Sequence, residues 1–120
     1  MALLRGSSQT TEINLTAVMN SAVESGIPYG TALLAFADAV LGRDDSALAA
    51  ARNTILTALG APALVDAAAV IATFMQMDRI ADGTGIPVDE SYLHRTRKIR
   101  ADLGLDTFAS AQNTLKNQLS

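Results

Sequence analysis

The chain has 120 residues, of which 49% are hydrophobic and only 4% aromatic, and its formal net charge at pH 7 is −3. A chain of this length forms one domain, residues 1–120, and because it has no cysteine it cannot by itself build a disulfide, a thiolate metal site or a thiol redox centre. Its nine basic residues do not form a patch interleaved with aromatic residues, which argues against a nucleic-acid partner.

The apolar content also bears on location and assembly. The apolar run in MALLRGSSQTTE is too short for the h-region of a signal peptide, and no later run reaches the length of a membrane span. We therefore expect a cytoplasmic protein with no membrane partner, in which residues 1–10 are flexible. A short chain this rich in apolar residues has difficulty burying them all, so we also expect a homo-oligomer.

The first third of the chain predicts two helices separated by a turn. Apolar residues recur at helical spacing after Thr10 or Thr11, either of which can cap the helix, until Gly26 and a nearby proline close it. A second apolar stripe runs over residues 33–41 and stops at Gly42.

A helical hairpin is predicted next. Asp44 or Asp45 can cap a helix that ends at Gly60, because acidic side chains suit the positive end of the helix dipole. Pro62 then suits the first turn of the following helix, where its missing N–H costs nothing. The inner stripe of the first of these two helices is Leu48, Ala51, Ile55 and Leu59.

The segment 62–82 is the most apolar part of the chain, and its polar residues change sides. Asp66 and Thr73 share one stripe of the helix. On nearly the opposite side lie Asp78, Arg79 and Asp82. A surface helix keeps one polar face. We therefore expect this helix to be central, with its own core on one flank and a second copy of the chain on the other.

The last third predicts one clear helix and one short segment. Asp89 can cap a helix over residues 90–104, whose basic run HRTRKIR is typical of a solvated face. The final segment can begin at Asp106 or Thr107 and is expected to bury Phe108, Ala111 and Leu115. No segment alternates as a strand does, so we predict an all-α fold, a compact bundle of five or six helices.

One stretch has the features of a known family. In LVDAAAVIATFMQMDRIADGTGIPVDE, residues 64–90, an acidic residue precedes an Ala/Val run, followed by Phe74, Asp78, Arg79, Ala81 and Asp82 and the exit GTGIPVD. This arrangement resembles the C-terminal helix of the AhpD-like superfamily, which includes alkylhydroperoxidase D and the carboxymuconolactone decarboxylases. The resemblance extends through ALLAFADAVL, ALAAARNTILTALG and LGLDTFASAQNT to cover residues 32–113, and its most specific motif is MDRIADGTGIP.

The resemblance implies an all-helical, oligomeric protein, and it limits the chemistry. The peroxidase branch of the superfamily uses a Cys-x-x-Cys pair with a nearby Glu and His, and this chain has no cysteine to form the thiolate, sulfenic acid or disulfide of that cycle. The chain resembles the structural half of such a protein, so peroxidase or disulfide reductase activity does not transfer to it. The decarboxylase branch needs no cysteine, which leaves a cysteine-free enzyme open.

Three residues are candidates for catalysis. Asp66 follows Pro62 by a few residues, where the helix dipole favours a carboxylate, and stabilisation of the first turn is its competing role. His94 is the only histidine, and Glu90 four residues earlier could orient its imidazole, although a solvated histidine is the competing interpretation. No cofactor is predicted, and no metal site, because no second histidine or any cysteine completes a ligand set.

Five residues near the end of the 62–82 helix are candidates for binding: Phe74, Met77, Asp78, Arg79 and Asp82. Arg79 can hold a carboxylate through two parallel hydrogen bonds, and its competing role is an ordinary ion pair within or between subunits. Phe74 and Met77 could line a pocket for an apolar ligand, and their competing role is packing in the core or at an interface.

These observations favour a non-catalytic homo-oligomer that associates through residues 62–82 and has a structural or small-molecule-binding role. One alternative is a cysteine-free enzyme of the carboxymuconolactone decarboxylase type. The other is one half of a split AhpD-like peroxidase, whose cysteines would lie on a separate chain.

Overall fold

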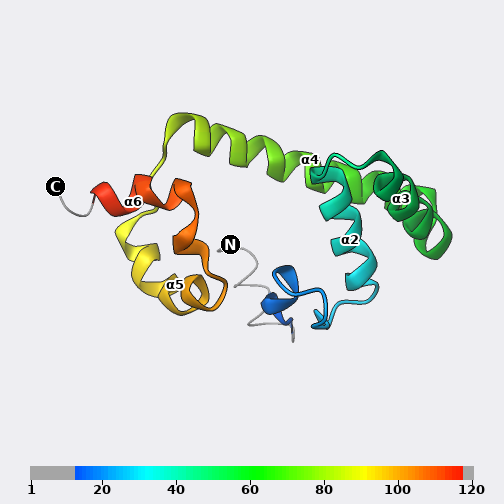
Figure 1. The fold of residues 1–120 in the computed structure, drawn as a ribbon, viewed down its shortest axis with the longest axis horizontal. Helices are drawn as coiled ribbons and strands as arrows, with labels where there is room; N and C mark the ends of the chain where they lie inside the picture. The colour runs from blue at the N-terminus through cyan, green and yellow to red at the C-terminus, as the bar shows by residue number, and fades with distance from the viewer. Residues whose placement is uncertain (1–12, 118–120) are drawn as a thin grey trace.

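The computed structural model describes the backbone of residues 13–117 and the side chains of residues 13–114. This part of the chain contains five α-helices, three short 3-10 helices and no strand, which confirms the all-α prediction (Figure 1). The α-helices are α2 (Gly30–Leu41), α3 (Asp45–Leu59), α4 (Ala61–Thr84), α5 (Glu90–Asp102) and α6 (Gln112–Asn117). The 3-10 helices are η1 (Leu15–Val18), η2 (Leu105–Thr107) and η3 (Ala109–Ala111). The predicted flexibility of residues 1–10 lies outside the described residues.

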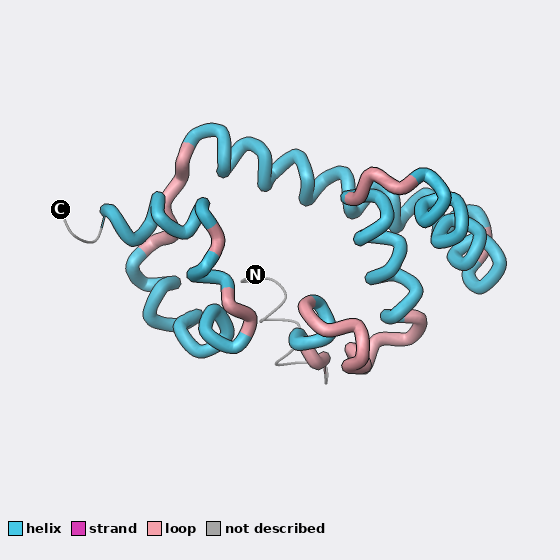
Figure 2. The backbone as a smooth tube through the Cα atoms, viewed as in Figure 1, coloured by secondary structure: helices cyan, strands magenta, loops and turns pink. Residues whose placement is uncertain are grey.

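Helix α4 joins two groups of helices. With 24 residues it is about 36 Å long, and it runs along the top of the view in Figures 1 and 2. Helices α2 and α3 pack against its N-terminal part, while α5, α6 and the turns between them lie at its C-terminal end. The radius of gyration is 16.0 Å, whereas a globular chain of this length has about 14 Å. The molecule is therefore elongated along α4.

The group formed by α2, α3 and the start of α4 matches the predicted boundaries. The Asp44 carboxylate caps α3 by accepting hydrogen bonds from the backbone N–H groups of Ser46 and Ala47 at 2.9 and 3.0 Å. Gly60 links α3 to α4 with a φ of 86°, a conformation that side chains with a Cβ rarely adopt. The centre of this group is dry, because Ile55 of α3 and Phe36 of α2 are both buried.

The predicted first helix is wrong. Only η1 forms in the described part of that segment, and it is followed by turns; the suggested caps Thr10 and Thr11 lie outside the described residues. Side chains satisfy the local backbone instead: Asn14 accepts from the N–H of Thr16, Asn20 from Ala22 and Ser25 from Ile27. These short polar side chains offer the backbone an alternative to the helical hydrogen bonds, which explains the loss of the helix.

The final segment is also less regular than predicted. Helix α5 begins at Glu90 as predicted but ends at Asp102, two residues early, and the Asp89 side chain makes no capping hydrogen bond. The chain then passes through η2 and η3 before α6 begins at Gln112. Phe108 was expected to be buried and is 52% exposed, because it has an extended backbone between the two 3-10 helices. Ala111 is half-buried, and the side chain of Leu115 lies outside the described residues. Asp106 does not cap a helix; its carboxylate pairs with Arg100.

Helix α4 was expected to have the core of its own chain on one flank, and this holds only in part. Its N-terminal part packs against α3 and α2, but none of its residues is buried within the chain. Several of its large side chains, including Val70 and Phe74, are exposed to solvent in the single chain. None of the described helices is both long and apolar enough to cross a membrane.

Candidate functional site

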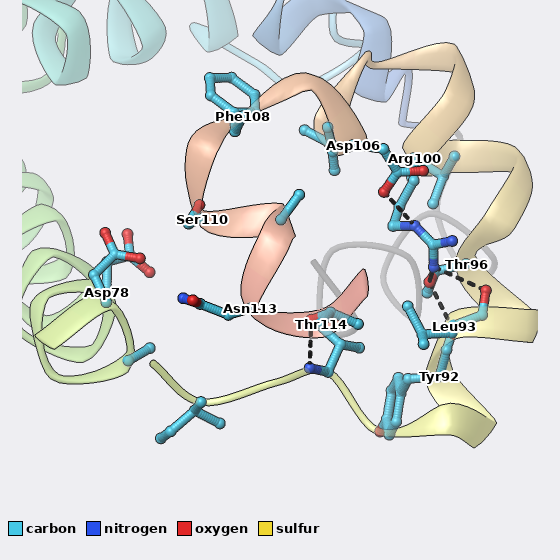
Figure 3. Close-up of a pocket in the computed structure, with 17 residues that line it drawn as sticks. Asp78, Tyr92, Leu93, Thr96, Arg100, Asp106, Phe108, Ser110, Asn113 and Thr114 are labelled. Atoms are coloured by element: carbon cyan, nitrogen blue, oxygen red, sulfur yellow. Dashed lines mark hydrogen bonds and ion pairs between the residues drawn. The ribbon is translucent and has the colours of Figure 1, made fainter. Parts of the chain in front are cut away.

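A cavity of about 640 Å³ lies between the C-terminal end of α4 and the group formed by α5, η2, η3 and α6 (Figure 3). Its walls are mainly apolar. They include Ile86, Val88, Leu93, Ile99 and Leu105, with the aromatic rings of Tyr92 and Phe108. A concave, mostly apolar space with a few polar groups is the usual form of a small-molecule site, and its volume falls within the range of such sites.

Arg100 holds the α5 wall of this cavity together. Its Nε donates to the Asp106 carboxylate at 2.9 Å, and its Nη1 donates to the Leu93 carbonyl at 2.8 Å and to Oγ1 of Thr96 at 2.9 Å. The Arg100 side chain is only 18% exposed. These contacts join α5 to η2, so the guanidinium acts as a structural link and its charge is balanced by Asp106.

The floor of the cavity is fixed by a contact distant in sequence. The Thr114 hydroxyl of α6 accepts a hydrogen bond from the backbone N–H of Val88 at 2.8 Å, which ties α6 to the turn that follows α4. Figure 3 shows this bond beneath Asn113, with Asp78 on the α4 side of the space and Arg100 on the opposite side. The cavity therefore exists because α4, α5 and α6 each supply one wall.

Of the five predicted binding residues, the cavity lining contains only two. Asp78 and Asp82 line it, whereas Phe74, Met77 and Arg79 do not. Arg79 forms no ion pair with any residue that the structure describes, so its predicted pairing within the chain is not found there. Phe74 and Met77 are exposed apolar residues on the surface of α4.

The three predicted catalytic residues do not come together at this cavity. Asp66, Glu90 and His94 are all exposed and none of them lines it. Within residues 13–114 no hydrogen bond or ion pair joins Glu90 to His94. The basic face of α5 has the local compensation expected for a solvated helix, because Lys98 pairs with Asp102 at 2.6 Å.

A second surface runs along α4. Six apolar residues recur at alternating intervals of four and three residues: Ala63, Ala67, Val70, Phe74, Met77 and Ala81. We call this row the α4 seam. The spacing is that of the a and d positions of a coiled coil, where such a row packs against another helix. Its two leading alanines are partly buried, whereas Val70, Phe74 and Met77 are 56%, 46% and 56% exposed.

The seam and the cavity meet at Ala81, which belongs to both. The motif MDRIADGTGIP thus covers the end of the seam and one wall of the cavity. The cavity lining also contains four polar residues that apolar periodicity does not point to: Thr96, Arg100, Asn113 and Thr114. A signal for Arg100 existed, because it follows Thr96 by four residues and precedes Leu103 by three, which places it on the inner side of α5.

Comparisons with known proteins add no assignment. A scan of family models, a search of curated proteins and a search of solved structures each found no match. Within the described residues, no group of three or more acidic or histidine side chains is arranged to hold a metal ion.

Proposed function

We propose that the protein is a thiol-free, AhpD-like helical protein of the cytoplasm that assembles with copies of itself through the α4 seam. The exposed row Val70, Phe74 and Met77 is the observation on which this proposal rests. Large apolar side chains at heptad spacing are stabilised by packing against a second helix, and within residues 13–117 no helix covers these three.

The exposed apolar side chains of α4 support an extensive contact. Val65, Val70, Phe74, Met77 and Ile80 are each at least 46% exposed in the single chain. Contiguous apolar surface of this kind is typical of an interface with another chain. A second copy is the simplest partner able to cover it.

Sedimentation velocity of three proteins tests the assembly. We expect the unmodified chain to sediment as a dimer or larger species at micromolar concentration, and Val70→Asp to sediment as a monomer because a carboxylate at the seam would be buried without a partner. Val65→Asp is the matched control: Val65 is on the same helix and equally apolar, but about 140° away around the axis. It should leave the assembly intact.

A monomeric unmodified chain, or equal dissociation by both substitutions, would overturn the proposal. A chain that is monomeric alone but forms a stable complex with a cysteine-bearing polypeptide would support the split-enzyme alternative instead. The cysteine-free enzyme has less support, because Asp66, Glu90 and His94 lie apart from the cavity.

The cavity favours small-molecule binding as the role of the assembled protein. It is concave, mainly apolar and held open by the Arg100 contacts and the Thr114–Val88 hydrogen bond, so its shape does not depend on a ligand. Binding of 1-naphthylmethanol, a neutral fluorescent probe, tests this role. We expect saturable binding to the unmodified protein and a clear loss for Leu93→Ser, which makes one wall polar. Absence of saturable binding would remove this role.

A further inference from the structure

We infer that the cavity selects an organic cation, an ammonium group attached to an apolar or aromatic body. This inference rests on the proposed small-molecule binding and adds the chemical class of the ligand. It follows from two properties of the walls: their apolar area and their unbalanced negative charge.

The charged residues that line the cavity carry a net negative charge. Four charged residues line it, namely Asp78, Asp82, Arg100 and Asp106. Arg100 and Asp106 form an ion pair at 2.9 Å and balance each other. Asp78 and Asp82 form no ion pair with any residue between 13 and 114, so they leave two negative charges on the α4 wall.

The two unpaired aspartates are accessible to a ligand. Both aspartates are exposed, and in Figure 3 Asp78 stands on the opposite side of the cavity from Arg100. The Arg100 guanidinium donates through Nε to Asp106 and through Nη1 to the Leu93 carbonyl and the Thr96 hydroxyl, and Asp106 balances its charge. A carboxylate or phosphate entering the cavity would therefore meet two like charges and no unbalanced cation among the lining residues.

The apolar walls determine the rest of the ligand. Besides the aspartates, the lining contains Leu93, Ile99 and Leu105, with the rings of Tyr92 and Phe108. A hydrated inorganic cation would gain nothing from this surface, whereas a hydrocarbon or aromatic body would be removed from water there. A molecule with one ammonium end and one apolar end can contact the aspartates and the apolar side chains at the same time.

Three naphthalene probes of nearly the same shape distinguish selection for a cationic ligand from binding of any apolar ligand. They are 1-naphthylmethylamine, which is cationic at neutral pH, neutral 1-naphthylmethanol and anionic 1-naphthylacetate, each titrated by fluorescence. We expect the amine to bind more tightly than the alcohol by about fivefold or more, because a carboxylate about 4 Å from an ammonium in water contributes about 1 kcal/mol. The acetate should bind most weakly, and the preference should shrink in high salt.

Two variants and a control assign the preference to the α4 wall. Asp78→Asn and Asp82→Asn keep the shape of the cavity and remove one charge each, so each should reduce the preference for the amine while leaving binding of the alcohol unchanged. Asp66→Asn removes an exposed charge from the same helix outside the cavity and should have no effect.

The outcomes are distinct. Equal binding of amine and alcohol, or tighter binding of the acetate, would overturn the ligand class while the cavity remained a binding site. Absence of binding by all three probes would reject both the class and the proposed binding role. A preference for the amine that Asp66→Asn removes as strongly as Asp78→Asn would show a general surface effect and would also overturn the inference.

Discussion

The two ends of α4 are held by different forces. At the N-terminal end, α2 and α3 pack aliphatic and aromatic side chains around Ile55 and Phe36. At the C-terminal end, α5 and α6 are held by side-chain hydrogen bonds, chiefly those of Arg100 and Thr114, around an open cavity. An apolar core closes upon itself, whereas a set of directed hydrogen bonds can keep walls apart. The difference explains how a cavity can stay open at the C-terminal end of α4.

The largest expected effect is the loss of the dry core. Ile55→Ala removes the only fully buried large side chain among the described residues and should lower the free energy of unfolding by about 2 to 5 kcal/mol in urea denaturation. Leu56→Ala is the control on the next residue, which is exposed, and should change it by less than about 0.5 kcal/mol. Equal effects of the two substitutions would show that this end has no specific core.

The C-terminal end of α4 should lose less stability when the Arg100 contacts are removed. Arg100→Met keeps the length of the side chain but leaves the Leu93 carbonyl, the Thr96 hydroxyl and the Asp106 carboxylate without this donor. We expect a loss of about 2 kcal/mol, with faster amide hydrogen exchange confined to α5 and η2. Arg97→Met, on the exposed side of α5, should leave exchange unchanged. Exchange that accelerates equally in α2 and α3 would contradict the separation of the two ends.

A smaller effect is expected at the floor of the cavity. Thr114→Val is nearly isosteric and removes the acceptor of the Val88 N–H, so it should cost about 1 kcal/mol in the same denaturation assay. Thr114→Ser keeps the hydroxyl and should lie close to the unmodified protein. If Thr114→Ser were as destabilising as Thr114→Val, packing of the methyl group rather than the hydrogen bond would hold α6 in place.

Sequence periodicity predicted the dry end better than the polar end, and the reason is physical. Helices α3 and α4 have strong caps and breakers at Asp44, Gly60 and Pro62, and the apolar stripe of α3 identifies the face that carries the buried Ile55. The cavity depends on contacts such as Thr114 with Val88, 26 residues apart, which leave no periodic pattern. The first predicted helix failed because the local hydrogen bonds of Asn14 and Asn20 compete with helix formation, an effect that apolar spacing does not reveal.

The smallest expected effect is the pH dependence of the α3 cap. Hydrogen bonds from the Ser46 hydroxyl and from the backbone N–H groups of Ala47 and Ser46 hold the pKa of Asp44 below its ordinary value. Because the folded pKa is the lower one, this stabilisation is present above the unfolded pKa of about 3.9 and is lost as the pH falls through the folded pKa.

Thermal melting of the unmodified protein and of Asp44→Asn checks the sign of this effect. Asparagine still caps the helix but does not titrate, so the unmodified protein should melt slightly higher at neutral pH, and the difference should shrink as the pH falls below the unfolded pKa of aspartate. A difference that grows on acidification would mean that the protonated Asp44 is the better cap.

The most direct test of the account is the reactivity of single thiols along α4. The chain has no cysteine, so Val70→Cys and Val65→Cys each introduce one thiol, at positions that are 56% and 66% exposed in the single chain. If a second copy covers the α4 seam, alkylation at position 70 should be slower than at position 65 by at least about tenfold, and the two rates should converge on dilution below the assembly concentration. Equal rates at every concentration would contradict the account, because the seam would then lie in solvent.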